Sequence, residues 1–354
     1  MIIEPDNDLL DYCGRIDFDN PKAPEFIFPC SYVRLRFTGS QIKAIVTNKN
    51  NYWDNYLGVI VDGVQTKVKL SNDENEKQII LLAEGLDIGE HDVTLFKRQD
   101  SCHMFRLHGF VLADDARLCA LPPISLRRIE VYGDSVSAGE VSEAYDYAGK
   151  EDPDWHRGEL SNSYYSYAWT AARMLGARIH DIAQGGIALL DKTGWFNAPD
   201  YMGMESVYDK LQYNPAFGIA KEWDFERYSP HVVIVAIGQN DNHPDDYMKL
   251  DYNSQKSKNW REHYFNFICK LRNIYPKSHI ILQTTILNHD ENWDRAIDEV
   301  YWRLLDECDD EKIHHYMYTK NGKGTPGHIR RDEAKQMADE LCAYINSLGS
   351  EVWT

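Results

Sequence analysis

The sequence lacks the marks of several large protein classes. Its 38 lysine and arginine residues are outnumbered by 56 aspartate and glutamate residues, for a net charge of −18, and no lysine- or arginine-rich run stands out. This balance argues against nucleic acid or an anionic membrane surface as a partner. The stretch MIIEPDNDLLDYCG at the N-terminus has neither a basic start nor a long apolar core, so it predicts neither a signal peptide nor a membrane anchor. We therefore expect a cytoplasmic protein with a neutral ligand.

The chain also has no Cys-x-x-Cys pair among its seven scattered cysteines. This scatter argues against a disulfide framework and against a structural zinc site, and it predicts reduced, mostly buried thiols. His243 in NDNHPDD and His289 in LNHDEN lie near acidic residues, but neither stretch has the spacing of a zinc-binding helix. We expect no metal and no other cofactor.

Two halves of the chain have different sequence patterns. Residues 1–122 consist of short strand-like segments separated by Gly, Asn and Asp turns, a pattern typical of an antiparallel β-sandwich. Residues 121–126, LPPISL, are hostile to helix and form a stiff link. Residues 123–354 then alternate short β-branched runs with amphipathic segments, which predicts an α/β domain. The expected sandwich strands are YVRLRFTG, QIKAIVTN, YLGVIVDG, KQIILLAEG and HDVTLFKR.

The second half predicts a parallel sheet covered by helices on both faces. Its apolar runs are RRIEVYG, ARIHDIA, HVVIVAIG and HIILQTTI. The predicted helices are residues 161–176, which begin on capping residues and end at a glycine, and residues 260–276, 293–307 and 329–349.

Polar residues follow the first three predicted parallel strands, and another lies in the turn before the last helix. Ligands of open parallel sheets bind beyond the carboxyl ends of the strands, so these residues are expected to share one site. Ser135 follows the first strand, Gly186 the second and Asn240 the third, while His328 lies in the turn before the last helix. A serine hydroxyl needs a neighbouring imidazole to take its proton, and the oxyanion that follows needs hydrogen-bond donors. The four positions supply this set, which favours nucleophilic catalysis over a set of unrelated turns.

These blocks resemble the SGNH (GDSL-type) hydrolases. YGDSVSAGE is similar to their nucleophile block, DIAQGGIAL to their glycine block, GQND to their Gly-x-Asn-Asp block, and GTPGH stands where their terminal histidine falls. The resemblance implies that Ser135 is the nucleophile and His328 the general base. It also implies an oxyanion hole formed by the amide of Ser135 with Gly186 and Asn240.

The first half adds a resemblance to carbohydrate esterase family 2. VRLRFTG, VIVDG and GEHDVTLFKR are similar to the N-terminal, jelly-roll-like β-sandwich of that family, whose members remove acetyl groups from xylan and mannan. This resemblance implies a serine esterase that deacetylates oligosaccharides of the xylan or mannan type through an acyl-enzyme. It leaves a homo-oligomer open.

The block around the histidine departs from the SGNH pattern. The family's third catalytic residue is an aspartate three positions before the histidine, and here that position is Thr325. A backbone carbonyl in this turn, that of Thr325 being nearest in sequence, could orient the imidazole without a carboxylate. Some family 2 esterases are similar in using such a Ser-His dyad. The nearest downstream acid, Asp332, lies four residues along the predicted helix, and we expect it to contribute little.

Two tryptophans on loops after predicted strands are candidates for binding sugar. Trp195 follows the glycine block and Trp293 follows the fourth strand, and an aromatic face suits the apolar face of a pyranose, although packing in the core is an equally good interpretation for either. Two other functions stay open. The protein could be a carbohydrate-binding protein in which the four blocks are idle, or a lipid esterase or thioesterase of the same superfamily.

Overall fold

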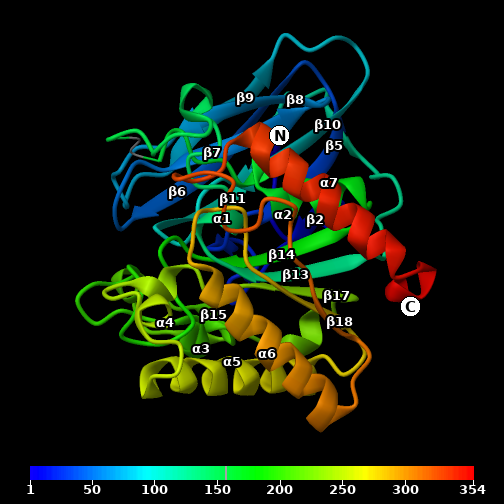
Figure 1. Ribbon diagram of the computed structural model, residues 1–354. Helices are drawn as coiled ribbons and strands as arrows, with labels where there is room; N and C mark the ends of the chain where they lie inside the picture. Colours follow the sequence, from blue (N-terminus) through cyan, green and yellow to red (C-terminus); the bar gives the residue numbers. More distant parts are fainter. Residues whose placement is uncertain (156–157) are drawn as a thin grey trace.

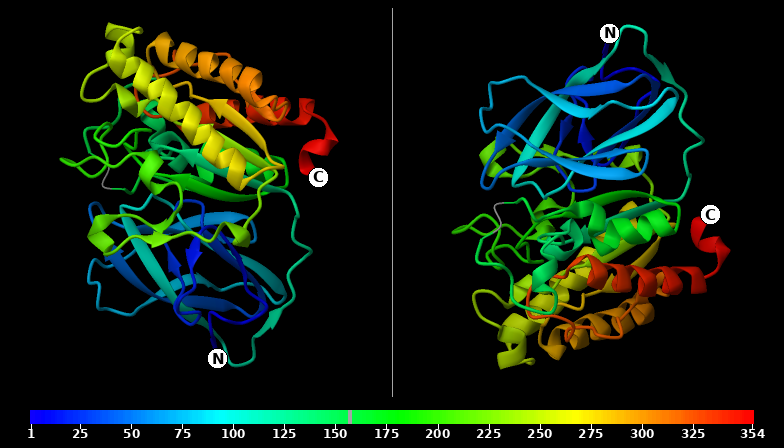
Figure 2. Two further views of the ribbon diagram at one scale, coloured as in Figure 1. Left: turned by 90° about the horizontal axis from the view of Figure 1, so that it is seen from below. Right: turned by 90° about the horizontal axis from the view of Figure 1, so that it is seen from above.

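The computed structural model describes residues 1–155 and 158–354 and places two units against each other (Figures 1 and 2). The sandwich unit contains the strands between residues 2 and 119, and the α/β unit begins with the strand at residue 128. Between them, residues 120–127 form an extended and largely exposed connection that includes the LPPISL segment. Figure 2 shows the sandwich strands on one side of the molecule and the long helices on the other.

The sandwich unit consists of two antiparallel sheets. The first has the order β3-β4-β11-β6-β9, with β1 paired to β11, and the second has the order β12-β5-β10-β7-β8, with β2 paired to β5. In the first sheet the strands are β1 (Ile2–Ile3), β3 (Ile16–Asp17), β4 (Glu25–Phe26), β6 (Gln41–Asn50), β9 (Gln78–Glu84) and β11 (His103–Leu112). In the second they are β2 (Asp11–Cys13), β5 (Tyr32–Thr38), β7 (Tyr56–Val61), β8 (Val64–Lys69), β10 (Glu90–Lys97) and β12 (Arg117–Cys119).

Alternation of apolar and polar residues explains why these segments form a sandwich. In β5, Val33, Leu35 and Phe37 are fully buried while the residues between them are partly exposed. Successive side chains of a strand point to opposite faces, so each sheet presents one apolar face to the other. These faces form a core of their own between the sheets.

The α/β unit is built on a parallel sheet with the strand order β14-β13-β17-β18-β19. Its strands are β13 (Arg128–Gly133), β14 (Arg178–Ala183), β17 (Val232–Ala236), β18 (His279–Gln283) and β19 (Ile313–His315). All the residues of β17 are buried, as expected for a strand covered on both faces. A small hairpin of β15 (Lys210–Gln212) and β16 (Lys221–Glu222) lies outside this sheet.

Helices cover both faces of the parallel sheet. Val131 and Ile234 pack with α2 (Tyr167–Met174) and α7 (Arg331–Ser347) on one face, whereas Tyr132 and Val235 pack with α5 (Gln255–Ile274) and α6 (Glu291–Cys308) on the other. The shorter helices are α1 (Ser135–Ala138), α3 (Met204–Val207) and α4 (Tyr247–Leu250). Turns of 3₁₀ helix lie at Tyr145–Tyr147, Ser163–Tyr165, Pro215–Phe217, Phe225–Arg227, Asn240–Asn242 and Ser350–Trp353.

The two units share a buried interface. Arg15, between β2 and β3, is fully buried and its Nη2 lies 2.8 Å from Glu130 Oε1 on β13. Arg15 Nη1 also donates to the backbone oxygen of Lys210 at 3.1 Å. A buried charge that lost its partner would be strongly unfavourable, so this pair favours one relative placement of the sandwich and the α/β sheet. The loops between sandwich strands are thereby held against the sheet that carries the candidate site.

The predicted fold, a sandwich followed by a parallel α/β sheet, is confirmed, but helix bounds differ: α5 begins at Gln255 rather than at 260, α7 begins at Arg331 rather than at 329, and α2 begins later than predicted. Residues 163–165 form a 3₁₀ turn between the extended residues Asn162 and Ser166. Helix α2 starts only at Tyr167, where the Ser166 side chain accepts a hydrogen bond from the Trp169 amide. Strand β19 and the β15–β16 hairpin carry no apolar run of useful length and were not predicted. All seven cysteines are free, and four of them are buried. Within the described ranges, every helix is too short or too polar to cross a bilayer.

Candidate active site

Ser135 lies at a sharp turn between β13 and α1. The Asp134 side chain caps α1 by accepting a hydrogen bond from the Val136 amide at 2.9 Å, and Ser135 is the first residue of the helix. Gly133 is required at this turn because a Cβ there would lie 2.2 Å from Ser137 Oγ. Helix α1 ends after a single turn, at Gly139, which adopts a left-handed conformation with φ 76°. The hydroxyl of Ser135 is thus fixed at the carboxyl end of the strand.

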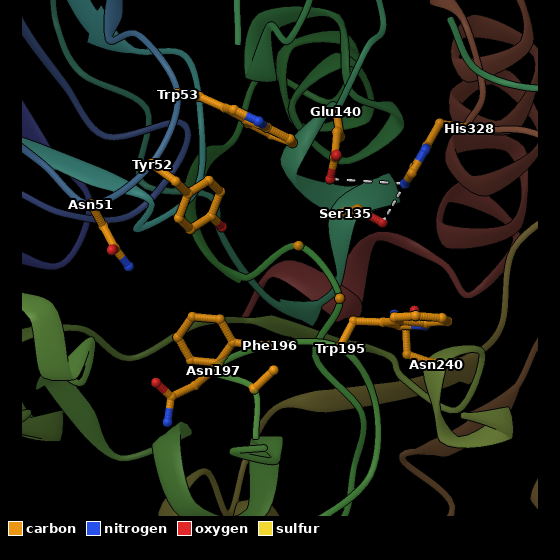
Figure 3. A pocket seen from close by; sticks show the side chains of 13 residues that line it. Asn51, Tyr52, Trp53, Ser135, Glu140, Trp195, Phe196, Asn197, Asn240 and His328 are labelled. Carbon is orange, nitrogen blue, oxygen red and sulfur yellow. Dashed lines mark hydrogen bonds and ion pairs between the residues drawn. The ribbon is translucent and has the colours of Figure 1, made fainter. Parts of the chain in front are cut away.

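His328 lies beside Ser135, as the strand-end argument predicts. Its Nε2 is 2.7 Å from Ser135 Oγ, a hydrogen-bond distance across 193 residues of sequence (Figure 3). The residue belongs to the turn between β19 and α7. Gly327 precedes it because the backbone of residues 150–152 crosses so closely that a Cβ would lie 2.6 Å from the Lys150 carbonyl oxygen. A serine and an imidazole in this contact form a nucleophile and base pair.

The orienting partner of His328 is Asp152, and the prediction that the Thr325 carbonyl orients the ring is wrong. Asp152 Oδ2 lies 2.5 Å from His328 Nδ1, and Asp152 Oδ1 accepts the backbone N–H of His328 at 3.0 Å. The Thr325 carbonyl instead accepts a hydrogen bond from the Asn288 amide at 2.9 Å, because residue 325 pairs with Leu287 as an isolated β-bridge. The residues therefore form a Ser-His-Asp chain whose third residue comes from another loop.

Arg330 fixes Asp152 from the other side. Its Nη2 lies 2.8 Å from Asp152 Oδ1, and its guanidinium is almost completely buried. Burial raises the pKa of the Asp152 carboxyl, but the hydrogen bonds and charges of His328 and Arg330 outweigh this and hold it well below its ordinary value. Asp152 is therefore a carboxylate across the pH range in which esterases work.

Sequence reasoning had no signal for Asp152. The residue lies 176 positions before His328, in the stretch KEDPDW, which contains two other acids that are equally plausible candidates by residue type. A loop of this kind has no periodicity, and nothing in the spacing ties it to the histidine turn. The close crossing of the chain at Gly327 brings the two together.

The glycine block is held in place by a residue of the sandwich unit. Asp100, in the β10–β11 loop at residues 98–102, accepts the backbone N–H of Gly185 and the side-chain amide of Gln184, both at 2.7 Å. Gly186 follows with φ 73°, and a Cβ there would lie 2.8 Å from Trp195 Cβ. Its carbonyl accepts the Trp195 amide at 2.7 Å. The β10–β11 loop thus supports the turn that carries Gly186.

Asn240 also faces the cavity. Its Nδ2 lies 3.1 Å from the Ile187 carbonyl and 3.2 Å from Asp134 Oδ2, so the amide is tied to both the glycine block and the nucleophile turn. The next residue, Asp241, is fully buried and accepts the Leu189 amide at 2.8 Å. The GQND block therefore connects β17 to the segment after β14.

The cavity is about 640 Å³ and has walls from both units (Figure 3). The α/β unit contributes Ser135 and His328, and the sandwich unit contributes Tyr52 and Trp53 from the β6–β7 loop. The sequence did not indicate this aromatic pair, because the loop's place over the sheet depends on how the units pack. The full lining consists of Asn51, Tyr52, Trp53, Ser135, Glu140, Gly185, Gly186, Trp195, Phe196, Asn197, Ala198, Asn240 and His328.

The two candidate tryptophans have different surroundings. Trp195 lines the cavity, is 59% exposed and stacks on the ring of His243 with 3.5 Å between ring centroids. Trp293 is 0% exposed and packs against Trp260 and Tyr247 in the core beneath α5 and α6. The prediction of a sugar contact for Trp293 is wrong, because Trp293, the third residue of α6, points into the core rather than toward the loops.

Charges around His328 favour its protonated form. Burial of the ring lowers its pKa, but the nearby Glu140 charge and the hydrogen bond to Asp152 outweigh this and raise it to about 9. Glu140 itself is crowded by other acids. Burial raises the pKa of its carboxyl to about 7, with the charge of His328 opposing this and the charge of Asp100 adding to it. The imidazolium that forms when a serine proton is transferred is thus stabilised in this site.

Comparisons with known proteins agree with this architecture. Residues 12–122 match the family model "Carbohydrate esterase 2 N-terminal". The chain is 32% identical over 279 residues to the cellulase/esterase CelE of Acetivibrio thermocellus, covering 78% of this chain but only 31% of that protein's length. It is 24% identical to the acetylxylan esterase / glucomannan deacetylase of Cellvibrio japonicus, covering 95% of this chain and 87% of that protein.

A solved structure extends the similarity to both units. The family two carbohydrate esterase from Clostridium thermocellum, solved in complex with cellohexaose, superposes with a TM-score of 0.78 at 26% sequence identity. The match covers 96% of this chain and 99% of that one. The chain therefore resembles the family 2 carbohydrate esterases in the sandwich, in the α/β unit and in their order.

Proposed function

We propose that this protein is a serine esterase that removes O-acetyl groups from oligosaccharides of the xylan or mannan type. The observation that carries the proposal is the hydrogen-bonded chain Ser135–His328–Asp152 at the floor of an open cavity with aromatic walls. The relatives named acetylxylan esterase / glucomannan deacetylase and family two carbohydrate esterase support the substrate class.

In the proposed reaction, Ser135 Oγ attacks the acetyl carbonyl carbon while His328 Nε2 takes the hydroxyl proton. The carbonyl oxygen becomes an oxyanion that accepts hydrogen bonds from the backbone N–H groups of Ser135 and Gly186 and from the Asn240 amide. His328 then returns its proton to the sugar oxygen, which leaves. Asp152 keeps Nδ1 of the ring protonated and stabilises the imidazolium. Water hydrolyses the acetyl-Ser135 by the same steps in reverse.

The cavity walls suit a carbohydrate. Tyr52 and Trp53 on one side and Trp195 on the other present partly exposed aromatic rings, and such rings pack on the apolar faces of pyranoses. No part of the proposal requires a metal or cofactor. An acyl pocket that accepts acetyl in preference to longer acids is the expectation from the resemblance to the family.

The test is acetate release from acetylated xylan and acetylated glucomannan oligosaccharides, measured in one assay beside an octanoyl ester. We expect acetate release from at least one of the two glycans and little hydrolysis of the octanoyl ester. Ser135→Ala should lower kcat by at least about 10³-fold with the fold intact, because no other hydroxyl replaces the nucleophile. Glycan binding without acetate release would instead favour a carbohydrate-binding protein, and comparable hydrolysis of the octanoyl ester would favour a lipid esterase.

We also propose that the protein acts in the cytoplasm on imported oligosaccharides. The support is its seven free thiols, of which Cys308 is exposed, since such thiols persist in a reducing compartment. Cell fractionation followed by detection of the protein tests this. Recovery from the culture medium or the cell surface would contradict it.

A further inference from the structure

Glu140 is a cavity residue that the proposed reaction above does not use. It follows α1 and its backbone N–H donates to the Ser135 carbonyl at 3.0 Å, so the turn that fixes the nucleophile also fixes this residue. Its side chain points into the cavity between Trp53 and His328 (Figure 3). The carboxylate lies close above the glycine block, since a Cβ on Gly185 would be only 2.9 Å from Glu140 Oε2.

The distance to His328 is the informative one. Glu140 Oε2 lies 3.8 Å from His328 Nε2, the same nitrogen that contacts Ser135 Oγ at 2.7 Å. Nδ1, on the other side of the ring, is already bonded to Asp152. The Glu140 carboxylate therefore flanks the nitrogen that must exchange protons with the reacting oxygens.

Two oxygens occupy the position next to Nε2 in turn. In the first half of the reaction it is the sugar oxygen, and in the second half it is the attacking water, because the second half retraces the first. The leaving sugar oxygen is bonded to carbon and has one hydrogen, which comes from Nε2. Water has two hydrogens, and only one of them goes to Nε2. A second acceptor beside Nε2 can thus hydrogen-bond to the water but not to the leaving sugar oxygen.

We propose that Glu140 binds and orients the water that hydrolyses the acetyl-enzyme, so that it accelerates deacylation and not acylation. The inference rests on the proposed function. In this step the water oxygen bonds to the acetyl carbon, one water proton passes to His328 Nε2, and the other stays on oxygen while hydrogen-bonded to Glu140. The tetrahedral intermediate then breaks its bond to Ser135 Oγ, which takes the proton back from Nε2. Acetic acid leaves, and Glu140 ends with the protonation state with which it began.

A single-turnover experiment with excess enzyme over 4-nitrophenyl acetate separates the two half-reactions. Release of nitrophenol gives the acylation rate, and the rise and decay of protein carrying one acetyl group, followed by intact-protein mass, gives the deacylation rate. Rates are compared on the plateaus of their pH profiles, so that a changed titration of His328 does not enter. We expect Glu140→Ala to slow deacylation by about 10- to 100-fold, the effect of losing a hydrogen bond to a charged group. Acylation should change by less than about threefold.

The conservative variant distinguishes water binding from a charge effect on the imidazolium. Glu140→Gln keeps an acceptor oxygen and loses the charge, so it should recover part of the deacylation rate that Glu140→Ala loses. If Glu140 acted only through its charge on His328, both variants would be equally slow and acylation would fall with deacylation, which would overturn the proposal. Deacylation at the wild-type rate in Glu140→Ala would overturn it as well.

Two controls separate failure of this inference from failure of the proposed function. Glu226→Gln removes an exposed carboxylate outside the cavity and should leave both rates unchanged. Absence of an acetyl adduct on wild-type protein and on the slow variants would reject the acyl-enzyme mechanism itself. An adduct that forms on Ser135 but decays equally fast in every Glu140 variant would reject only the role of Glu140.

Discussion

On the α/β side of the cavity, Ser135 is 5% exposed and the side chain of His328 is 21% exposed. A chain of hydrogen bonds runs from Ser135 through His328 to Asp152 and on to Arg330. On the sandwich side, Tyr52 and Trp53 are each more than a third exposed and belong to a loop between two strands. Groups that exchange protons must be held in one geometry, whereas a surface that accommodates a flexible glycan need not be. The difference indicates a division of roles. The α/β side of the cavity, here called the reacting wall, carries out the reaction, and the sandwich side with Tyr52 and Trp53, here called the binding wall, binds the glycan.

Asp100 crosses this division. It belongs to the sandwich unit, but its carboxylate holds the Gly185 amide and the Gln184 side chain of the α/β unit. The sandwich is therefore expected to affect the rate of reaction as well as binding. Changes to each wall test this comparison.

The largest effect after loss of the nucleophile is expected from Asp152→Asn. The amide cannot stabilise the imidazolium and can present its NH₂ group to Nδ1, so kcat on an aryl acetate should fall by about 10²- to 10³-fold. The matched control is Asp332→Asn, an exposed acid on the first turn of α7, which should stay within about tenfold of wild type. A mild Asp152→Asn phenotype would show that Ser135 and His328 act as a dyad.

A smaller loss is expected from Asp100→Asn. The asparagine side chain can present its NH₂ group where Asp100 accepts two hydrogen bonds from Gln184 and Gly185, which loosens the glycine block. We therefore expect kcat to fall by about 10- to 100-fold while KM changes little. Asp115→Asn, an exposed acid on another loop of the sandwich, is the control and should match wild type. An unchanged kcat in Asp100→Asn would restrict the sandwich unit to binding.

Trp53→Ala should affect binding alone. Loss of the ring removes apolar contact worth about 1–2 kcal/mol, so KM for acetylated oligosaccharides should rise by about 5- to 20-fold. Because an aryl acetate is too small to need this wall, its kcat/KM should stay within about twofold. Trp302→Ala, on α6 and 60% exposed, is the control outside the cavity. Equal losses on both substrates would argue that Trp53 supports the reacting wall.

The smallest effect is a displaced pH profile. His328 must be neutral to take the serine proton, and its pKa is raised to about 9, so kcat/KM should increase with pH until that value. Asp134, Asp152 and Glu140 are the acids whose charge faces the ring. Glu140→Gln removes one of these charges and should move the rising limb of the profile to lower pH, whereas Glu226→Gln should not. A limb that stays in place would mean that the Glu140 charge does not set the basicity of His328 and that Asp152 and Asp134 account for it.

Much of the α/β unit could be predicted because its signals are local. The runs RIEVYG and VVIVA are short, β-branched and buried on both faces, so they identify strands without any knowledge of their neighbours. Strand β19 has only three residues and gave no such signal. The same holds for the start of α2, where residues 163–165 fit a helix by composition but turn as 3₁₀ before the Ser166 cap.

The sequence by itself determined which residues can gather at one edge of the sheet. Ser135, Gly186 and Asn240 each follow a parallel strand, and because parallel strands end on the same side, their positions along the chain imply their proximity in space. Only the tertiary structure decided which loops close over that edge. Asp152 contacts His328 176 positions away, Asp100 contacts Gly185 85 positions away, and Trp53 reaches the cavity from the sandwich unit. Local sequence pattern carries no information about contacts at such separations, and the entropy of closing longer loops grows only slowly with their length. Trp293 lies in the core instead, because the packing of α6 on the sheet, and not the polarity of its flanking residues, sets the direction of its side chain.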